Sequence, residues 1–421
     1  PYLSENSKTL VVGPSTWHEG TEIAQPITWS AHFTPLGQRL QESTATELLA
    51  LRQLSTQSGI TSLAMGLPDP ALIPVERFQQ AWEAILSRIG AEALGVSPVQ
   101  GIAPLRELLS DRLRCQGVSA NPENVVVVND SQQGLDLLLR LFTEPGDTVI
   151  TEAPTYYRNG MEVERVEFLL ARYRPRLIYT GPTYQNPTGC TMSLERRQKL
   201  LTLAQRYQVP IIEDDPFSEL YFDEPPPPPI KALDDAGHVL YLGTFSKCLS
   251  PGLRVGWLVA PQPVAKLATL LRRATDLQPN TLGQHLVIEF ARRGWLDEHV
   301  AAARASYANR CQAMDAALRR HLPRGAKWHT PGGGLFLWLE LPEQVAAHEL
   351  PSETGQQGVV FLPGRFLYPT NGRQNVCRLN FSVPDEESIE RAVAVLGSAL
   401  CKLLCREVGV VAEQTLVSPA V

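Results

Sequence analysis

Apolar and polar positions follow two different periods through the middle of the chain. Val125–Val128 is apolar throughout, as expected of a strand buried on both faces of a sheet. The next segment places Leu135, Leu138, Leu139 and Phe142 at the i, i+3, i+4, i+7 spacing of a helix. Further strands are expected at Thr148–Ile150, Leu177–Tyr179, Val209–Glu213, Val239–Leu242 and Gly256–Ala260, with a helix capped by Ser193. This alternation predicts an α/β fold whose mostly parallel sheet has helices on both faces.

The flanking segments predict the rest of the architecture. Helices are expected at Thr44–Leu51, Arg77–Ile89 and Pro104–Arg114, and a long helical stretch follows Val264. Strands at Trp328–Leu341 and Val376–Ser382 indicate a second, α+β domain. We therefore expect an N-terminal arm at 1–30, a large domain at 66–290, and a smaller domain formed by 31–65 with 291–421. Five consecutive prolines, Pro225–Pro229, predict a stiff surface segment.

Composition narrows the class of protein. The chain has 421 residues, 43% hydrophobic and 19% charged, with a net charge of −6, which is ordinary for a soluble enzyme. This charge argues against nucleic-acid or anionic-membrane partners, and no apolar run approaches the roughly 20 residues that span a bilayer. Seven scattered cysteines without a CxxC pair favour a reduced, cytoplasmic setting. Cys401 and Cys405 are expected to be two buried thiols rather than metal ligands, and no metal site is predicted.

One lysine stands out in the segment Gly243–Gly256. Lys247 follows an apolar strand and is flanked by the hydroxyls of Thr244 and Ser246, with Arg254 seven residues further on. Schiff-base chemistry needs a lysine amine that can be neutral near pH 7, which burial beside cationic groups favours. Hydroxyls and a guanidinium are also suited to binding a phosphate. The alternative is a surface loop with one Lys and one Arg.

Four further positions carry candidate chemistry. Ser131 begins a helix, where backbone N–H groups attract phosphate, although Ser131 or Asp130 would also serve as an ordinary helix cap. Asp214 ends a strand, where a carboxylate can hold the protonated ring nitrogen of pyridoxal 5′-phosphate (PLP); such strand ends are also common caps or solvated edges. Asn186 lies in a turn and could donate to the phenolic oxygen of this cofactor. Arg378 could bind an α-carboxylate with two parallel hydrogen bonds, or form a surface salt bridge.

Taken in order, these motifs closely resemble the class I/II aminotransferases of PLP fold type I. The chain carries "GLPDP", "SQQGLDLL", "PTYY", "QNPTG", "EDDP", "GTFSKCLSPGLRVGW", "PGGGLFLW" and "CRLNFS" between Ile27 and Leu400. The pattern is most similar to the 2-aminoadipate/kynurenine aminotransferase branch, and it is shared by the aminotransferase-like domains of GntR-type regulators. The resemblance implies a homodimer that moves an amino group between an amino acid and a 2-oxo acid.

The resemblance also implies roles for individual residues. Lys247 would hold PLP as a Schiff base and move the proton during transamination, which leaves the cofactor as pyridoxamine phosphate. Asp214 would pair with the pyridine nitrogen, Asn186 would reach the phenolic oxygen, and Tyr156 would stack on the ring. The phosphate would be bound by Ser131, Gln132, Thr244, Ser246 and Arg254. The substrate carboxylate would be held by Arg378, Asn186 and the Gly66 backbone.

Four positions depart from the family pattern. Phe217 stands where the family usually has a tyrosine, which removes one hydrogen bond to the cofactor oxygen and should raise the pKa of the Schiff base. Val96 stands where relatives offer a tyrosine to the partner subunit's phosphate. Asp130 replaces a glycine, and its charge should repel a phosphate unless it points away or is protonated. Thr46 replaces an arginine that binds the acidic side chain of the substrate in aminoadipate-type enzymes, which argues against an acidic substrate.

The segment after "PTYY" is unusually short. Only 28 residues separate Tyr157 from Asn186, and relatives have more than a dozen more, enough for another strand and turn. Either a loop is deleted or some residues are missing from the sequence, and we favour the second.

Two other functions stay open. The departures around the cofactor fit a specialised PLP enzyme that catalyses elimination, substitution or oxidation in a biosynthetic pathway. The other alternative is the effector domain of a transcription regulator, which would need a complete winged helix-turn-helix domain before this fold.

Overall fold

The computed structural model describes residues 32–35, 37–38, 45–154, 161–368 and 372–416, without the side chains of 45–46 and 406–416. The chain divides into two compact units, Pro1–Glu47 and Leu48–Val421, and the sheets and the candidate site lie in the second. The predicted arm at 1–30 lies outside the described residues. The predicted boundaries between the large and small domains remain a prediction.

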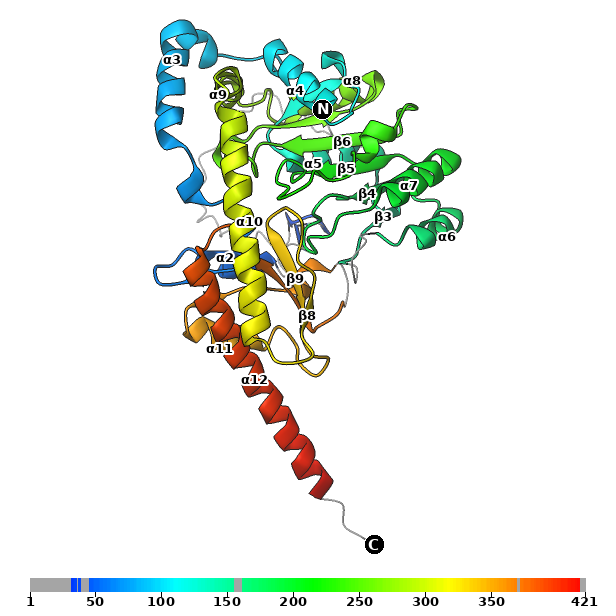
Figure 1. The fold of residues 1–421 in the computed structure, drawn as a ribbon. Coiled ribbons are helices and arrows are strands. Elements are labelled where there is room, and N and C mark those ends of the chain that lie inside the picture. Colours follow the sequence, from blue (N-terminus) through cyan, green and yellow to red (C-terminus); the bar gives the residue numbers. More distant parts are fainter. Residues whose placement is uncertain (1–31, 36, 39–44, 155–160, 369–371, 417–421) are drawn as a thin grey trace, which may run out of the picture. The chain divides into compact units, whose positions relative to one another are not determined.

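A six-stranded sheet forms the centre of the second unit (Figure 1). Its spatial order is β2 (Val125–Val128), β7 (Gly256–Val259), β6 (Val239–Thr244), β5 (Ile211–Asp215), β4 (Leu177–Thr180) and β3 (Val149–Thr151). β3 to β6 are parallel to one another, and β7 runs antiparallel to both of its neighbours. This confirms the predicted mostly parallel sheet. The carboxyl ends of five strands therefore meet at one edge, where ligands bind in sheets of this kind.

Both faces of the sheet are buried, as the all-apolar strands predicted. In β2, Val125 and Val127 pack into one core cluster while Val126 and Val128 pack into another, because successive side chains of a strand point to opposite faces. One face is covered by α5 (Ser131–Phe142) and α8 (Gln262–Thr275). The opposite face is covered by α4 (Ala103–Cys115), α6 (Val163–Tyr173), α7 (Leu194–Tyr207) and α9 (Thr281–Arg292). The side chain of Ser193 caps α7 as predicted, by accepting from the Arg196 N–H.

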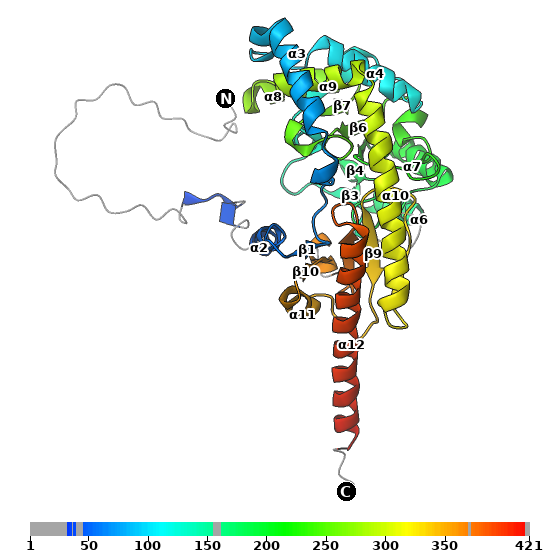
Figure 2. The same ribbon diagram turned by 60° about the vertical axis from the view of Figure 1, so that its left-hand side comes forward.

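A second, four-stranded antiparallel sheet has the order β11 (Leu362–Pro363), β12 (Val376–Asn380), β9 (Phe336–Glu340) and β8 (Lys327–Trp328). β1 (Thr61–Ser62) and β10 (Val359–Val360) form a small parallel pair. The helices α10 (Trp295–His321) and α12 (Glu386–Leu416) run side by side in both views (Figures 1 and 2). The other helices are α2 (Ala45–Leu54), α3 (Val75–Ala93) and α11 (Leu350–Gln356), with short 3₁₀ turns at Pro70–Leu72, Pro122–Asn124, Ile230–Leu233, Pro251–Leu253 and Gly364–Leu367.

The two edge strands of the large sheet differ in how their backbone hydrogen-bonding groups are covered. At β2, the backbone N–H of Val127 donates to the carbonyl of Gln100 (2.9 Å), and the side-chain amide of Gln100 donates to the Val125 carbonyl (2.9 Å). The other edge is β3, which has three residues and pairs with β4 alone among the described strands.

Two local predictions were wrong. The single strand expected at Trp328–Leu341 is two strands, β8 and β9, because the glycines 332–334 form a turn between them. Cys401 and Cys405 are exposed rather than buried, since they lie on a face of α12 that the described residues leave open. Within the described part of the chain, no helix is long and apolar enough to cross a membrane, and no cluster of three or more His, Cys, Asp or Glu could hold a metal ion.

Candidate active site

Lys247 lies in the turn that connects β6 to β7, at the carboxyl edge of the large sheet. Its Nζ donates a hydrogen bond to the carbonyl of Gly66 (2.8 Å). Burial lowers the pKa of Lys247, and the nearby guanidinium groups of Arg378 and Arg254 act in the same direction. A lysine in this environment is closer to the neutral, nucleophilic form than one in water.

Asp214 is near the end of β5 and faces the same cavity as Lys247. Its Oδ2 accepts a hydrogen bond from the phenol of Tyr179 at 2.9 Å. Its Oδ1 is buried and has no hydrogen-bond partner. Burial raises the pKa of Asp214 to about 6. A buried carboxylate oxygen without a partner is costly, and a ligand that brings an N–H would relieve that cost.

Asn186 and Arg378 form a second polar pair. The guanidinium of Arg378 donates from Nη1 to Asn186 Oδ1 (2.7 Å) and from Nη2 to the Ala64 carbonyl (2.6 Å). Arg378 is only 6% exposed, so the surface salt bridge considered from the sequence is excluded. Its Nε is also buried without a partner, its side chain stacks over the Phe336 ring at 4.1 Å, and burial lowers its pKa to about 9. A buried cation with an unused donor is suited to binding a carboxylate.

Two apolar features shape this part of the cavity. Phe217 is buried and packs edge-on against Phe336, with ring centroids 5.8 Å apart. Position 217 therefore offers an apolar ring without a hydroxyl. Gly66 allows its backbone to approach closely, because a Cβ at this position would lie 2.6 Å from Phe336 Cζ. We call Asp214, Tyr179, Asn186 and Phe217 the ring end of the cavity.

At the other side of Lys247, α5 begins directly after β2. Asp130 caps this helix, as one sequence alternative predicted, and its Oδ1 accepts from the Ser131 N–H at 2.8 Å. Its Oδ2 accepts from Ser246 Oγ (3.0 Å) and forms an ion pair with Arg254. Burial opposes ionisation here, but hydrogen bonds from Thr244, Arg254 and Ser246 outweigh it and lower the pKa of Asp130. We call Asp130, Ser131, Ser246 and Arg254 the phosphate end.

Residues of both ends line one cavity of about 220 Å³. Its wall includes Lys247, Asp214, Asn186, Phe217, Asp130, Ser131, Gln132 and Thr244. The ring end fits PLP, since the unpaired Asp214 oxygen can accept from a protonated pyridine nitrogen beside the amine that would bond to the cofactor. The phosphate end has donors of the right kind, but they are already bonded to Asp130.

The structure brings most of the predicted site residues together. Lys247, Asp214 and Asn186 line the same cavity. Lys247 also contacts Gly66, and Arg378 contacts Asn186. Arg254 and Ser246 meet through Asp130. Thr244 ends β6, where its Oγ1 accepts from the Ser246 N–H (2.9 Å). Gln132 is exposed on α5, and Tyr156 lies outside the described residues.

Sequence reasoning missed two residues of the site. Tyr179 is the partner of Asp214, and its place at the end of β4, next to β5 in the sheet, was the available signal. Glu152 is partly buried and accepts hydrogen bonds from Thr180 and Gln185, and desolvation raises its pKa. Its position directly after β3 was the corresponding signal.

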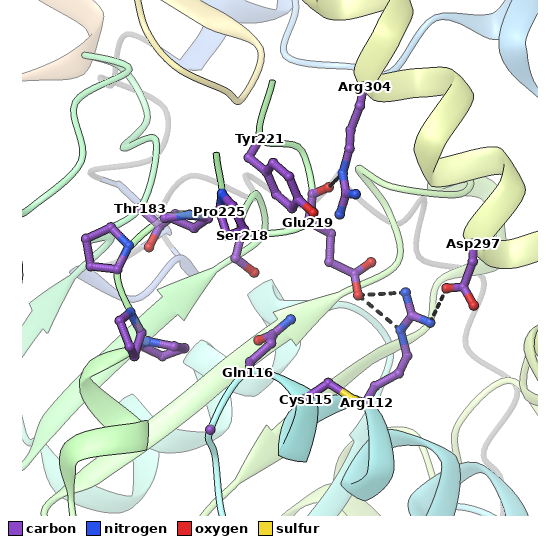
Figure 3. A pocket seen from close by; sticks show the side chains of 15 residues that line it. Arg112, Cys115, Gln116, Thr183, Ser218, Glu219, Tyr221, Pro225, Asp297 and Arg304 are labelled. Carbon is purple, nitrogen blue, oxygen red and sulfur yellow. Dashed lines mark hydrogen bonds and ion pairs between the residues drawn. The ribbon is translucent and has the colours of Figure 1, made fainter. Parts of the chain in front are cut away.

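A larger cavity of about 660 Å³ lies elsewhere, lined by the five-proline run and by side chains of α4 and α10 (Figure 3). Its charged groups are paired with one another: Arg112 lies between Glu219 and Asp297, at 2.8 and 2.6 Å. Arg304 donates to the Glu219 carbonyl and stacks on Tyr221. No lysine lines this cavity, so the smaller cavity beside Lys247 is the candidate active site.

Comparison with known proteins agrees with this geometry. The family model "Aminotransferase class I and II" matches residues 73–177 and 177–396. A 2-aminoadipate transaminase of Thermus thermophilus is 37% identical over 403 residues, which covers 90% of this chain and 99% of that protein. The crystal structure of a Pyrococcus horikoshii kynurenine aminotransferase in complex with PMP is 34% identical, with a TM-score of 0.84, and covers 89% of this chain and 98% of that one.

A more distant relative belongs to the other class considered above. The uncharacterised HTH-type transcriptional regulator YdfD of Bacillus subtilis is 28% identical over 95% of this chain and 85% of its own length. The family model nevertheless matches most of the chain, and the two aminotransferases are more similar to it in sequence than this regulator. The chain therefore belongs to the class I and II aminotransferases, PLP-dependent transferases of fold type I that move amino groups between amino acids and 2-oxo acids.

Proposed function

We propose that PLP is bound covalently to Lys247 and that this lysine carries the proton transfers of the reaction. The observation that supports the proposal is the pairing, in one cavity, of a partly buried lysine of lowered pKa with a buried carboxylate oxygen of Asp214 that has no partner. PLP supplies an electron sink for the carbanion formed at the α-carbon of an amino acid. Lys247 Nζ, as a neutral amine, would accept the proton from that carbon.

The surrounding residues would orient the reactants. Asp214 would hold the ring nitrogen in its protonated form, and Tyr179 would fix the Asp214 carboxylate through its phenol. Asn186 would donate to the phenolic oxygen of the cofactor, and Tyr156 would stack on the ring. Arg378 would bind the substrate α-carboxylate together with the Gly66 backbone. Since Thr46 stands in place of an acid-reading arginine, we expect neutral or aromatic amino acids to react faster than 2-aminoadipate.

At the other end, the proposed phosphate ligands are Ser131, Gln132, Thr244, Ser246 and Arg254. They combine helix-start N–H groups, hydroxyls and a guanidinium, which is the chemistry of a phosphate site.

We also propose a homodimer, in line with the family. Val96 is 80% exposed, which fits a segment that faces a second subunit. Light scattering of the purified protein would test this, and a monomer would contradict it. The cytoplasmic location remains a prediction.

The decisive experiment is reduction of the PLP-loaded protein with borohydride, followed by peptide mapping. We expect the pyridoxyl group on Lys247 in the parent and in Lys266→Ala, a control at an exposed position on α8. Lys247→Ala should carry no covalent cofactor. Covalent labelling of Lys247→Ala at the parent level, or of another lysine in the parent, would refute the proposal.

A half-reaction separates transamination from the other PLP chemistries. Mixing the loaded protein with one amino acid should release one keto acid per molecule of pyridoxamine phosphate formed. Free ammonia without pyridoxamine phosphate would indicate elimination instead. A loaded protein that binds amino acids without forming either product would favour the sensor function of the regulator relatives.

A further inference from the structure

The backbone at Asp130 has a conformation that few side chains adopt. Its φ of 91° and ψ of 158° lie in a region that is essentially restricted to glycine. Gly256 of β7 packs directly on this peptide, since a Cβ there would lie 2.7 Å from the Asp130 carbonyl carbon and 2.8 Å from the Ser131 nitrogen. The chain is therefore held on this path by packing from β7, and the Asp130 side chain projects into the cavity.

The Asp130 carboxylate uses both of its oxygens in this position. Oδ1 accepts from the first N–H of α5, and Oδ2 accepts from the Ser246 hydroxyl and from Arg254. Three of the groups proposed to bind the cofactor phosphate are thus bonded to an anion of the chain itself. Like a phosphate, a carboxylate is an anion whose oxygens accept hydrogen bonds. The Asp130 carboxylate and the phosphate would therefore compete for the same donors.

We propose that Asp130 is a built-in competitor of the phosphate group, and that phosphorylated ligands enter this end of the cavity only when the Asp130 carboxylate leaves Ser131, Ser246 and Arg254. The inference rests on the proposed function, because it takes these three residues as the phosphate site. It makes Asp130 a specificity-determining residue. The phosphate of PLP should contribute less to binding affinity in the parent chain than in a variant without this carboxylate.

Two variants separate charge from backbone strain. Asp130→Asn keeps the shape and the helix cap but removes the negative charge. Asp130→Gly removes the side chain and also suits the observed φ. Asp136→Asn is the matched control, since Asp136 lies on the same helix with its side chain 53% exposed and paired with Arg140.

The test compares PLP with pyridoxal, which has the same ring and aldehyde but no phosphate. Dissociation constants for both are measured on the cofactor-free protein by absorbance titration. We expect Asp130→Asn and Asp130→Gly to bind PLP about 10- to 100-fold more tightly than the parent, the scale of one charge-assisted hydrogen bond. Pyridoxal affinity should change by less than about twofold, and Asp136→Asn should match the parent for both ligands.

Unchanged or weaker PLP binding in Asp130→Asn would overturn the inference, and so would an equal gain for pyridoxal. If the Asp130 variants do not fold, the parent decides: the inference requires that inorganic phosphate compete only weakly with PLP for the parent protein, and strong competition by phosphate would overturn it. The proposed function fails in a different way, since neither PLP nor pyridoxal would then form a reducible bond with Lys247 in any variant.

Discussion

The two ends of the cavity beside Lys247 differ in what their polar groups contact. At the ring end, the Oδ1 atom of Asp214 is buried and has no hydrogen-bond partner. At the phosphate end, Ser131, Ser246 and Arg254 are all bonded to Asp130. The comparison shows that one half of a ligand site can keep an unpaired hydrogen-bonding atom for its ligand, while the donors of the other half are bonded to a side chain of the protein itself. An unpaired buried atom is costly, whereas an internally satisfied site must be opened before it binds.

The largest expected effect concerns the substrate. Arg378→Lys should reduce kcat/KM for amino acids by about 100-fold, because a lysine cannot form the paired hydrogen bonds of a guanidinium and the site is buried. The affinity for PLP should stay the same. Single-turnover kinetics with an amino acid and with the corresponding amine, which has no carboxylate, would measure this. Equal losses for both substrates would show that Arg378 does not bind the carboxylate.

The ring end can be tested through stability. Without cofactor, burial holds the pKa of Asp214 at about 6, compared with about 3.9 in an unfolded chain. Ionisation therefore destabilises the folded protein: this penalty is absent below about pH 4, grows as the pH rises, and is complete above the folded pKa. Asp214→Asn removes it, and the Asn oxygen can still accept from Tyr179.

We therefore expect cofactor-free Asp214→Asn to be more stable than the parent by up to about 3 kcal/mol at pH 7.5, and no more stable at pH 3.5. Its affinity for PLP should fall, because an amide does not stabilise a protonated ring nitrogen. Urea unfolding at the two pH values is the measurement. A loss of stability at pH 7.5 would mean that the Asp214 carboxylate is already satisfied.

The phosphate end depends on the contact between β7 and α5. Gly256→Ala should cost about 2 kcal/mol of stability, because its Cβ would meet the backbone of Asp130 and Ser131, which cannot rotate away. The substitution should also weaken the binding of PLP more than the binding of pyridoxal. Gly355→Ala is the matched control, since a Cβ there meets nothing within 4 Å and α11 tolerates alanine. Thermal unfolding of both variants would check this, and equal effects would contradict it.

The smallest effect concerns the missing phenol. Phe217→Tyr should restore a hydrogen bond to the phenolic oxygen of PLP and stabilise its ionised form. The pH midpoint of the absorbance change of the bound cofactor should therefore fall by about one unit. Phe222→Tyr, which alters a ring packed against Phe381, should leave the midpoint unchanged. A midpoint that rises or stays constant in Phe217→Tyr would place this side chain away from the cofactor oxygen.

The sequence predicted the strands and helices of the large sheet well, because their apolar side chains are buried on both faces. β2 was predicted to the residue, and β5 was displaced by two residues because Gln208 ends α7 in a left-handed conformation and the strand begins after Pro210. The motifs also predicted Lys247, Asp214 and Arg378 as site residues, and their roles stay predictions. The pairing of Asp130 with Ser246 and Arg254 could not be predicted, because it depends on how residues more than 100 positions apart meet.

The edges of the large sheet have a consequence for the behaviour of the protein in concentrated solution. Unpaired strand edges act as templates on which a second chain can add a strand and begin to aggregate. The β2 edge is blocked by Gln100, and the β3 edge offers only three residues, too few for extended pairing. Among the described residues, neither edge therefore favours self-association, whereas lengthening β3 without covering it would invite it.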